Sequence, residues 1–150
     1  MRFANLIPPR PQCQLLGVGY GGGLRGDKDS PRSYAINPAA LGDPWFRGTG
    51  FTETSKLPDS VGYVWDSVQP GCAVPTPTVL FHYEGLGRNG NPTSADAVRY
   101  TAPSGARVFS SGSLYFVWGL DNYYGHRDVP PDARLRQFMR NALADLTSKH

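Results

Sequence analysis

The chain has 150 residues, so we expect a single domain with one core over residues 1–150. Fifteen basic and twelve acidic residues give a formal charge of +3, and the arginines are scattered along the chain. Because nucleic-acid binding needs a concentrated basic surface, the charge pattern argues against a nucleic-acid partner.

Apolar residues never form the run of roughly twenty that spans a membrane, so we expect a soluble protein with no membrane partner. The apolar stretch in Met1–Pro9 is too short, and too soon broken by proline, for a signal peptide. A cytoplasmic location is therefore slightly favoured.

The N-terminal half is rich in glycine and proline, and we expect loops to dominate it. Gln12–Tyr20 is predicted to form a short buried strand that ends, at the glycines of 21–23, in a sharp turn or in a loop that passes close to another segment, since glycine tolerates positive φ and close backbone approach. Leu24–Pro44 shows neither the period of a strand nor that of a helix. This segment is predicted to be a long ordered loop.

The two cysteines, Cys13 and Cys72, lack the C-x-x-C spacing of a zinc site. They could form one disulfide in an exported protein. Two buried thiols are the more frequent outcome in a cytosolic one. The sequence leaves both alternatives open.

The middle of the chain contains short β-rich runs separated by glycine, proline and serine, which is typical of strands joined by turns. The predicted strands are Val61–Trp65, Thr78–Tyr83, Ala97–Thr101, Ala106–Ser110 and Ser113–Val117. The third and fourth of these are separated by a turn of hairpin length. Gly85–Ser94 is predicted to be a loop.

The clearest element is a C-terminal helix. Its apolar residues recur at the helical period and share one face: Leu135, Phe138, Met139, Ala142, Leu143 and Leu146. Pro130, Pro131 and Asp132 mark its start, because proline fits the first turn and an acid stabilises the helix N-terminus. We expect this face to pack on a sheet.

Three phrases are more specific than any composition argument: DPWFRGTGF at 43–51, LPDSVGYVWD at 57–66 and SGARVFSSGSLYFVWGLD at 104–121. Together with the closing helix, they resemble the C-terminal part of the N,N-dimethylformamidase large (beta) subunit over roughly residues 43–146. The resemblance implies an α/β fold, namely the later part of a Rossmann-like sandwich of the class I glutamine amidotransferase-like kind. The chain would then be a fragment, a trimmed relative, or a subunit whose incomplete sheet is covered by a partner chain or by self-association.

The resemblance also implies an amidohydrolase that cleaves the C–N bond of a small amide with iron bound by tyrosine and glutamate. The residues themselves predict no cofactor, and we place no iron ligand on this chain. In the phrase VGYVWD, the family pattern has glutamate where this chain has Val64. Valine can neither accept nor donate a proton, so a function of that glutamate is lost here. Asp66 in the same phrase remains a candidate acid or base.

His82 and Glu84 stand at the end of a predicted strand, in FHYEG. Residues two apart on a strand face the same side, so they could supply a base and an acid, or two metal ligands, to one cleft. The alternative is that this common spacing has no function. With Asp66, they are the candidate catalytic residues.

A second candidate group, for ligand binding, precedes the last helix: Trp118, Asp121, Tyr123 and His126. Carboxylate, phenol and imidazole groups bind metals or polar ligands. The alternative is an aromatic collar that packs the helix on the sheet, with Asp121 accepting backbone N–H bonds.

The motifs of serine hydrolases, P-loops and dinucleotide-binding folds are all absent. Three functions remain. The chain is a domain related to amide hydrolases that is not catalytic alone, a hydrolase that becomes active with another chain, or a ligand-binding or structural module in a larger assembly. We favour the first.

Overall fold

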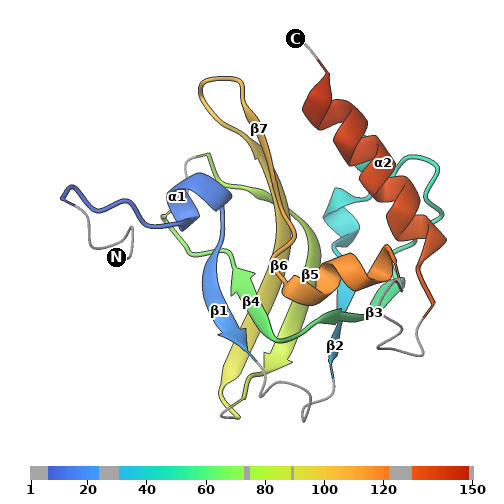
Figure 1. The fold of residues 1–150 in the computed structure, drawn as a ribbon, viewed down its shortest axis with the longest axis horizontal. Coiled ribbons are helices and arrows are strands. Elements are labelled where there is room, and N and C mark those ends of the chain that lie inside the picture. Colours follow the sequence, from blue (N-terminus) through green and yellow to red (C-terminus); the bar gives the residue numbers. More distant parts are fainter. Residues whose placement is uncertain (1–6, 24–30, 73–74, 89, 122–129, 149–150) are drawn as a thin grey trace.

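The computed structural model describes residues 7–23, 31–72, 75–88, 90–121 and 130–148 (Figure 1). In chain order its helices and strands are α1 (Cys13–Leu16), β1 (Gly19–Gly23), β2 (Arg32–Ile36), the 3₁₀ helices η3 (Pro38–Ala40) and η4 (Pro44–Phe46), β3 (Lys56–Val61), β4 (Val64–Ser67), β5 (Thr78–Leu86), β6 (Pro92–Thr101), β7 (Arg107–Ser110), the 3₁₀ helix η5 (Leu114–Gly119) and α2 (Ala133–Thr147). None of the helices in the described residues is long and apolar enough to cross a membrane.

The strands form a five-stranded sheet of order β3-β2-β5-β6-β7 and a separate two-stranded ribbon of β1 and β4. All pairings between these strands are antiparallel. The fold is therefore α/β in content, but the predicted Rossmann-like sandwich is wrong, because that architecture requires parallel strands joined by helical crossovers. Short turns join β5 to β6 and β6 to β7, and connections of this length produce antiparallel neighbours.

The β1–β4 ribbon lies across β6 of the larger sheet (Figure 1). Trp65 is 1% exposed, and its indole Nε1 donates to Thr93 Oγ1 on β6 at 3.1 Å. Thr93 Oγ1 in turn donates to the carbonyl of Gly21 on β1 at 2.8 Å. A single β6 hydroxyl therefore fastens both strands of the ribbon.

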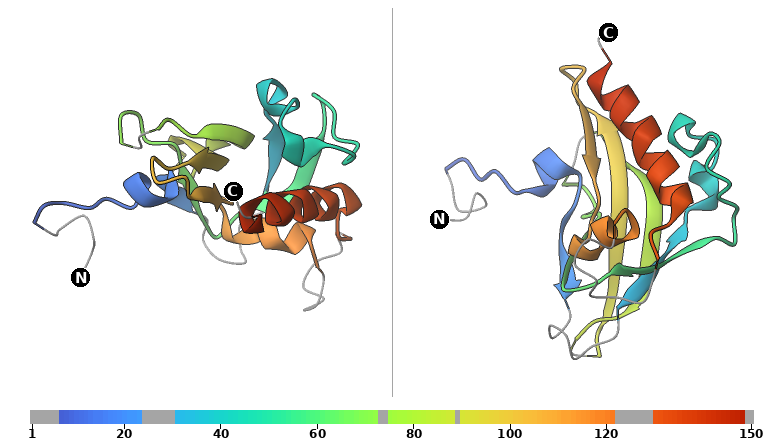
Figure 2. Two further views of the ribbon diagram at one scale, coloured as in Figure 1. Left: turned by 90° about the horizontal axis from the view of Figure 1, so that it is seen from above. Right: turned by 45° about the vertical axis from the view of Figure 1, so that its right-hand side comes forward.

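Helix α2 packs across one face of the large sheet, as the right-hand view in Figure 2 shows. The predicted helix is confirmed: Leu135, Phe138 and Ala142 are all fully buried. The Phe138 ring lies 5.0 Å from the ring of Phe81 on β5. Leu143 was predicted on the buried face but is 54% exposed, because it lies at the edge of the apolar stripe.

The predictions for the N-terminal half are largely wrong. Gln12–Tyr20 contains helix α1 and only the start of β1, and the glycines of 21–23 form the strand itself rather than a turn. A Cβ on Gly21 would lie 2.7 Å from the Ser94 carbonyl oxygen, and one on Gly22 would lie 2.9 Å from Trp65. These glycines allow close packing that any side chain would prevent.

The predicted loop Leu24–Pro44 contains β2, an inner strand between β3 and β5. Its five residues are too few to show a clear period, so sheet pairing decides their conformation. Half of the predicted loop Gly85–Ser94 is strand as well, because β5 continues to Leu86 and β6 begins at Pro92. The strand prediction at 78–83 and the hairpin prediction for 97–110 are confirmed.

Val61–Trp65 was predicted to be one strand, but a corner at Gly62 and Tyr63 separates β3 from β4. Tyr63 has a φ of 60°, a left-handed value that is unusual for tyrosine.

The predicted strand Ser113–Val117 is instead the 3₁₀ helix η5. Ser113 caps this helix, since its hydroxyl accepts a hydrogen bond from the Tyr115 amide at 3.2 Å.

Cys13 and Cys72 form a disulfide with their Cα atoms 5.9 Å apart. The structure thus resolves the two alternatives in favour of the bonded pair. The bond ties α1 to the segment that follows β4.

Candidate functional site

His82 and Asp96 form a side-chain pair on adjacent strands. They are direct neighbours in the β5–β6 register, and His82 Nδ1 lies 2.6 Å from Asp96 Oδ1. The Asp96 side chain is 6% exposed, and that of His82 is 42% exposed. Asp96 Oδ2 also accepts a hydrogen bond from the Val68 amide at 2.8 Å. Asp96 therefore orients the imidazole and fastens the segment after β4.

Asp96 was missed by the sequence reasoning. The surroundings of Asp96 could have pointed to it, since this acid stands between Ala95 and Ala97 in the buried part of a strand. A buried carboxylate needs a partner, and the register supplies His82.

The other two candidate catalytic residues, Glu84 and Asp66, lie on different strands from each other. Glu84 follows His82 at a spacing of two on β5, as predicted, but it is exposed and lies opposite Ser94. Asp66 is on β4 and is in register with Tyr20 of β1. Burial raises the pKa of Asp66. The predicted trio is thus divided between the large sheet and the ribbon.

Tyr34 is a buried phenol whose hydroxyl donates to the Ser111 carbonyl at 3.1 Å. Burial, and then the charges of Asp96 and Asp66, raise its pKa well above the usual value. An iron-bound tyrosine is a phenolate, and this environment opposes the phenolate. The described residues also contain no group of three or more His, Cys, Asp or Glu that could hold a metal. Tyr34 is therefore poorly suited to be the iron-bound tyrosine that the family resemblance implies.

Trp118, of the second candidate group, stacks on Tyr115 with ring centroids 3.9 Å apart and planes 18° apart. The η5 helix packs on β3 and on the start of α2, where the Asp132 amide donates to the Gly119 carbonyl at 2.8 Å. Asp121 is exposed. Tyr123 and His126 lie outside the described residues. The aromatic collar is the alternative that the described part of this group supports.

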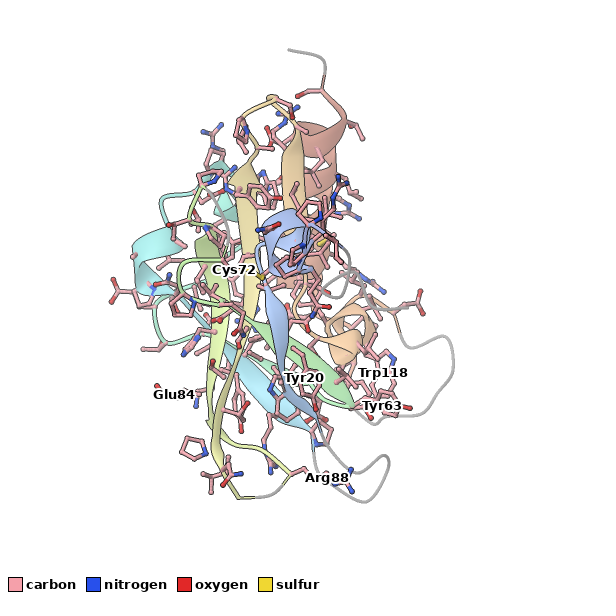
Figure 3. The ribbon with its side chains drawn as sticks, turned by 90° about the vertical axis from the view of Figure 1, so that its left-hand side faces the viewer. Tyr20, Tyr63, Cys72, Glu84, Arg88 and Trp118 are labelled. Atoms are coloured by element: carbon pink, nitrogen blue, oxygen red, sulfur yellow. A yellow bond between two sulfur atoms is a disulfide. The ribbon has the colours of Figure 1, made fainter. Side chains whose placement is uncertain are left out.

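A surface that the sequence reasoning did not identify joins the ribbon to η5. We call it the aromatic face and define it by its members Tyr20, Tyr63, Val64, Val117 and Trp118. Tyr20 is 67% exposed, Tyr63 51% and Val117 53%. In Figure 3, the labelled Tyr20, Tyr63 and Trp118 gather on one side of the molecule.

Packing distances at two glycines show how closely the segments that carry the aromatic face approach one another. A Cβ on Gly23 would lie 2.7 Å from the Tyr63 carbonyl oxygen and 3.8 Å from the Tyr20 hydroxyl. At the neighbouring corner, a Cβ on Gly62 would lie 2.0 Å from the Tyr115 ring, on which Trp118 stacks. The two glycines therefore let β1 lie close to the corner at Tyr63, and let that corner lie close to η5.

One carboxylate borders the aromatic face. Val64 and Asp66 are two residues apart on β4, so they share the side opposite the buried Trp65. Asp66 is also the register partner of the exposed Tyr20. The aromatic face thus combines apolar rings with an acid at its edge.

A family model described as N,N-dimethylformamidase beta subunit-like, C-terminal, matches residues 2–128. The chain belongs to this family. A search of curated proteins found no match. The family match starts well before Asp43, so it includes α1, β1 and β2, and it ends before α2. The His82–Asp96 pair and the aromatic face both lie within the matched N,N-dimethylformamidase beta subunit-like region.

Proposed function

We propose that this chain is a binding domain of its family, non-catalytic on its own, and that its aromatic face binds an extended, proline-rich peptide segment. The single observation that carries the proposal is the grouping of the exposed Tyr20 and Tyr63 with the partly exposed Trp118 on the ribbon and η5. A soluble domain rarely exposes grouped large aromatic side chains without a binding role.

The chemistry of the aromatic face favours proline over other apolar ligands. Proline-rich segments are recognised by rows of tyrosine and tryptophan, because the stiff polyproline helix loses little entropy on binding and its rings pack flat on aromatic planes. Tyrosine is suited to this task, since its ring buries apolar area while its hydroxyl stays wet. Asp66 at the edge supplies a partner for a basic residue of the ligand.

The positions of the candidate catalytic residues support a non-catalytic role. Asp96 is engaged on both oxygens, by His82 and by the Val68 amide, and so contributes to the fold. Val64, at the position where the family pattern has glutamate, is 37% exposed and belongs to the aromatic face. A surface valine at that position suits binding rather than acid–base chemistry.

The direct test is a titration with a synthetic peptide containing Pro-Pro-Arg-Pro, with an alanine-for-proline peptide as control. Trp45 and Trp65 are each 1% exposed, so a fluorescence change on binding reports mainly Trp118. We expect saturable binding that is lost in Tyr63→Asn. Asparagine tolerates the left-handed backbone at this position, so the substitution removes the ring without straining the corner. Tyr63→Phe keeps the ring and should bind.

Exposed Leu86 offers a matched control, because Leu86→Ala removes apolar surface at the far end of β5. Equal affinity in the wild type, Tyr63→Asn and Leu86→Ala would contradict the proposal. Hydrolysis of formamide and N,N-dimethylformamide by the same preparation should stay at background, and turnover above background would refute the non-catalytic assignment.

The His82–Asp96 pair supports a second candidate function, an amide hydrolase completed by another chain. A carboxylate on Nδ1 leaves Nε2 of the half-exposed imidazole as the nitrogen for proton transfer, which is the arrangement of a general base. If the chain gains amidase activity with a partner, His82→Gln should abolish it. Activity that survives this substitution would exclude the pair.

A further inference from the structure

We propose that the ligand of the aromatic face is the segment Ile7–Pro11 of a second copy of this chain, so that two copies pair by exchanging their N-terminal segments. We call Ile7–Pro11 the arm. The inference rests on the proposed function and deepens it by naming the ligand.

The arm has the composition that the aromatic face should recognise. It reads Ile-Pro-Pro-Arg-Pro, with prolines three positions apart at Pro8 and Pro11. Proline fixes its own φ and narrows the conformations of the preceding residue, so the three prolines restrict the arm before it binds. Arg10 adds a positive charge for Asp66 at the edge of the aromatic face.

The position of the arm calls for a partner. Ile7 is 100% exposed, and residues 8–10 are also exposed. Figures 1 and 2 show this segment running away from the body of the molecule. Its base is held in place, because Cys13 in α1 is 6% exposed and is bonded to Cys72. An apolar, stiff segment projecting from a fixed base is suited to reach another molecule.

The length of the arm argues against binding within one chain. Even if the arm were fully extended in the polyproline conformation, its five residues would span at most about 16 Å. The five residues of β1, which lead from α1 toward the corner at Tyr63, span about 17 Å. The arm would first have to reverse direction at Gln12, so its prolines would fall short of Tyr63 and Trp118. An arm donated by a second copy is not subject to this limit on reach.

The mutual exchange is closed and symmetric, since each copy gives one arm and offers one aromatic face. Two contacts then form together, and each raises the effective concentration of the other. A dimer can therefore be stable although one arm alone binds weakly.

The experiment measures the molar mass of the whole chain by light scattering over a range of concentrations. We expect a concentration-dependent dimer in the wild type. Replacing the arm by an equally long Gly-Ser segment, or replacing the ring in Tyr63→Asn, should weaken dimerisation by about tenfold or more. Leu86→Ala should dimerise as the wild type does.

Mixing the two defective variants supplies the decisive result. The arm-less variant keeps its aromatic face, and Tyr63→Asn keeps its arm, so a concentrated mixture can form one of the two contacts. The mixture should associate more strongly than either variant alone and more weakly than the wild type. A mixture that associates no more than either variant alone overturns the exchange. A dimer that is unaffected by either change also overturns it.

The peptide Ile-Pro-Pro-Arg-Pro-Gln, taken from this chain, separates the two proposals. Binding of this peptide to a wild type that remains monomeric would mean that the arm occupies another site or binds within its own chain, which overturns the exchange and leaves the proposed function standing. If this peptide does not bind but other proline-rich peptides do, the exchange is likewise overturned and the proposed function still stands. Failure of every proline-rich peptide overturns both.

Discussion

The indole Nε1 of Trp45 donates a hydrogen bond to Asp145 Oδ2 at 3.1 Å, across 100 residues of the chain. Asp145 also accepts from Arg107 Nη1 on β7 at 2.7 Å. One carboxylate on α2 thus ties together η4, the edge of the large sheet and the C-terminal helix. Trp45 is 1% exposed, so its N–H depends on this partner.

Asp145→Ala should lower the free energy of unfolding by about 1–3 kcal/mol, because it leaves the buried indole N–H of Trp45 without its acceptor and removes the carboxylate that accepts from Arg107 Nη1. Urea denaturation measures the change. Arg140→Ala on the exposed side of α2 is the control and should change stability by less than about 0.5 kcal/mol. Equal effects of the two substitutions would show that the tie adds nothing.

Phe138→Ala should be the most destabilising single truncation in α2. The Phe138 ring lies 5.0 Å from Phe46, 5.0 Å from Phe81 and 5.9 Å from Trp45. Removing such a buried ring typically lowers stability by about 3–5 kcal/mol, since both apolar burial and packing are lost. Thermal unfolding measures the change. The exposed Leu143→Ala should have almost no effect, and a large loss there would contradict the described orientation of α2.

The sequence predicted the parts of the fold that local rules determine. The apolar period of α2 and its start at Asp132 are local features, and both are confirmed, with Asp132 capping the helix through the Arg134 amide at 2.8 Å. The hairpin of β6 and β7 follows from turn residues in the same way. The parallel sheet was inferred from the family resemblance, and strand direction depends on pairing that single segments do not encode.

The site was predictable only in part, for similar physical reasons. His82 was identified from its strand, but its partner Asp96 depends on the β5–β6 register. The aromatic face depends on the left-handed corner at Tyr63 and on close packing at Gly23 and Gly62. Both features arise from contacts between distant segments, which residue types and spacing do not reveal.

The Cys13–Cys72 bond should contribute substantially to stability. It closes a loop with a sequence separation of 59, for which the chain-entropy model gives about 4 kcal/mol. The double substitution Cys13→Ser and Cys72→Ser should lower the free energy of unfolding by roughly this amount. Reductant should destabilise the wild type and leave the double variant unchanged. A wild type indifferent to reductant would show that the two thiols are not bonded in solution.

Asp66 should make the stability of the chain depend on pH in a defined direction. Burial raises its pKa, so the folded chain holds this proton more tightly than the unfolded chain does. The contribution of Asp66 to the free energy of unfolding therefore decreases as the pH rises. The decrease begins near the ordinary pKa of an aspartate and ends above the raised pKa that Asp66 has in the folded chain. Asp66→Asn keeps the shape and removes the buried charge. The variant should be more stable than the wild type at about pH 7, and this advantage should disappear near pH 3, where the carboxyl is protonated in both states.

Thermal unfolding of both proteins between about pH 3 and pH 7 measures this difference, and the exposed Asp121→Asn serves as the matched control. A stability difference for Asp66→Asn that is constant across this range would show that the pKa of this carboxyl is the same in the folded and unfolded chain.

The same variant also reports on the aromatic face. Because the amide keeps the packing of the carboxyl and lacks its charge, weaker peptide binding with higher stability at neutral pH would assign Asp66 to ligand recognition rather than to folding.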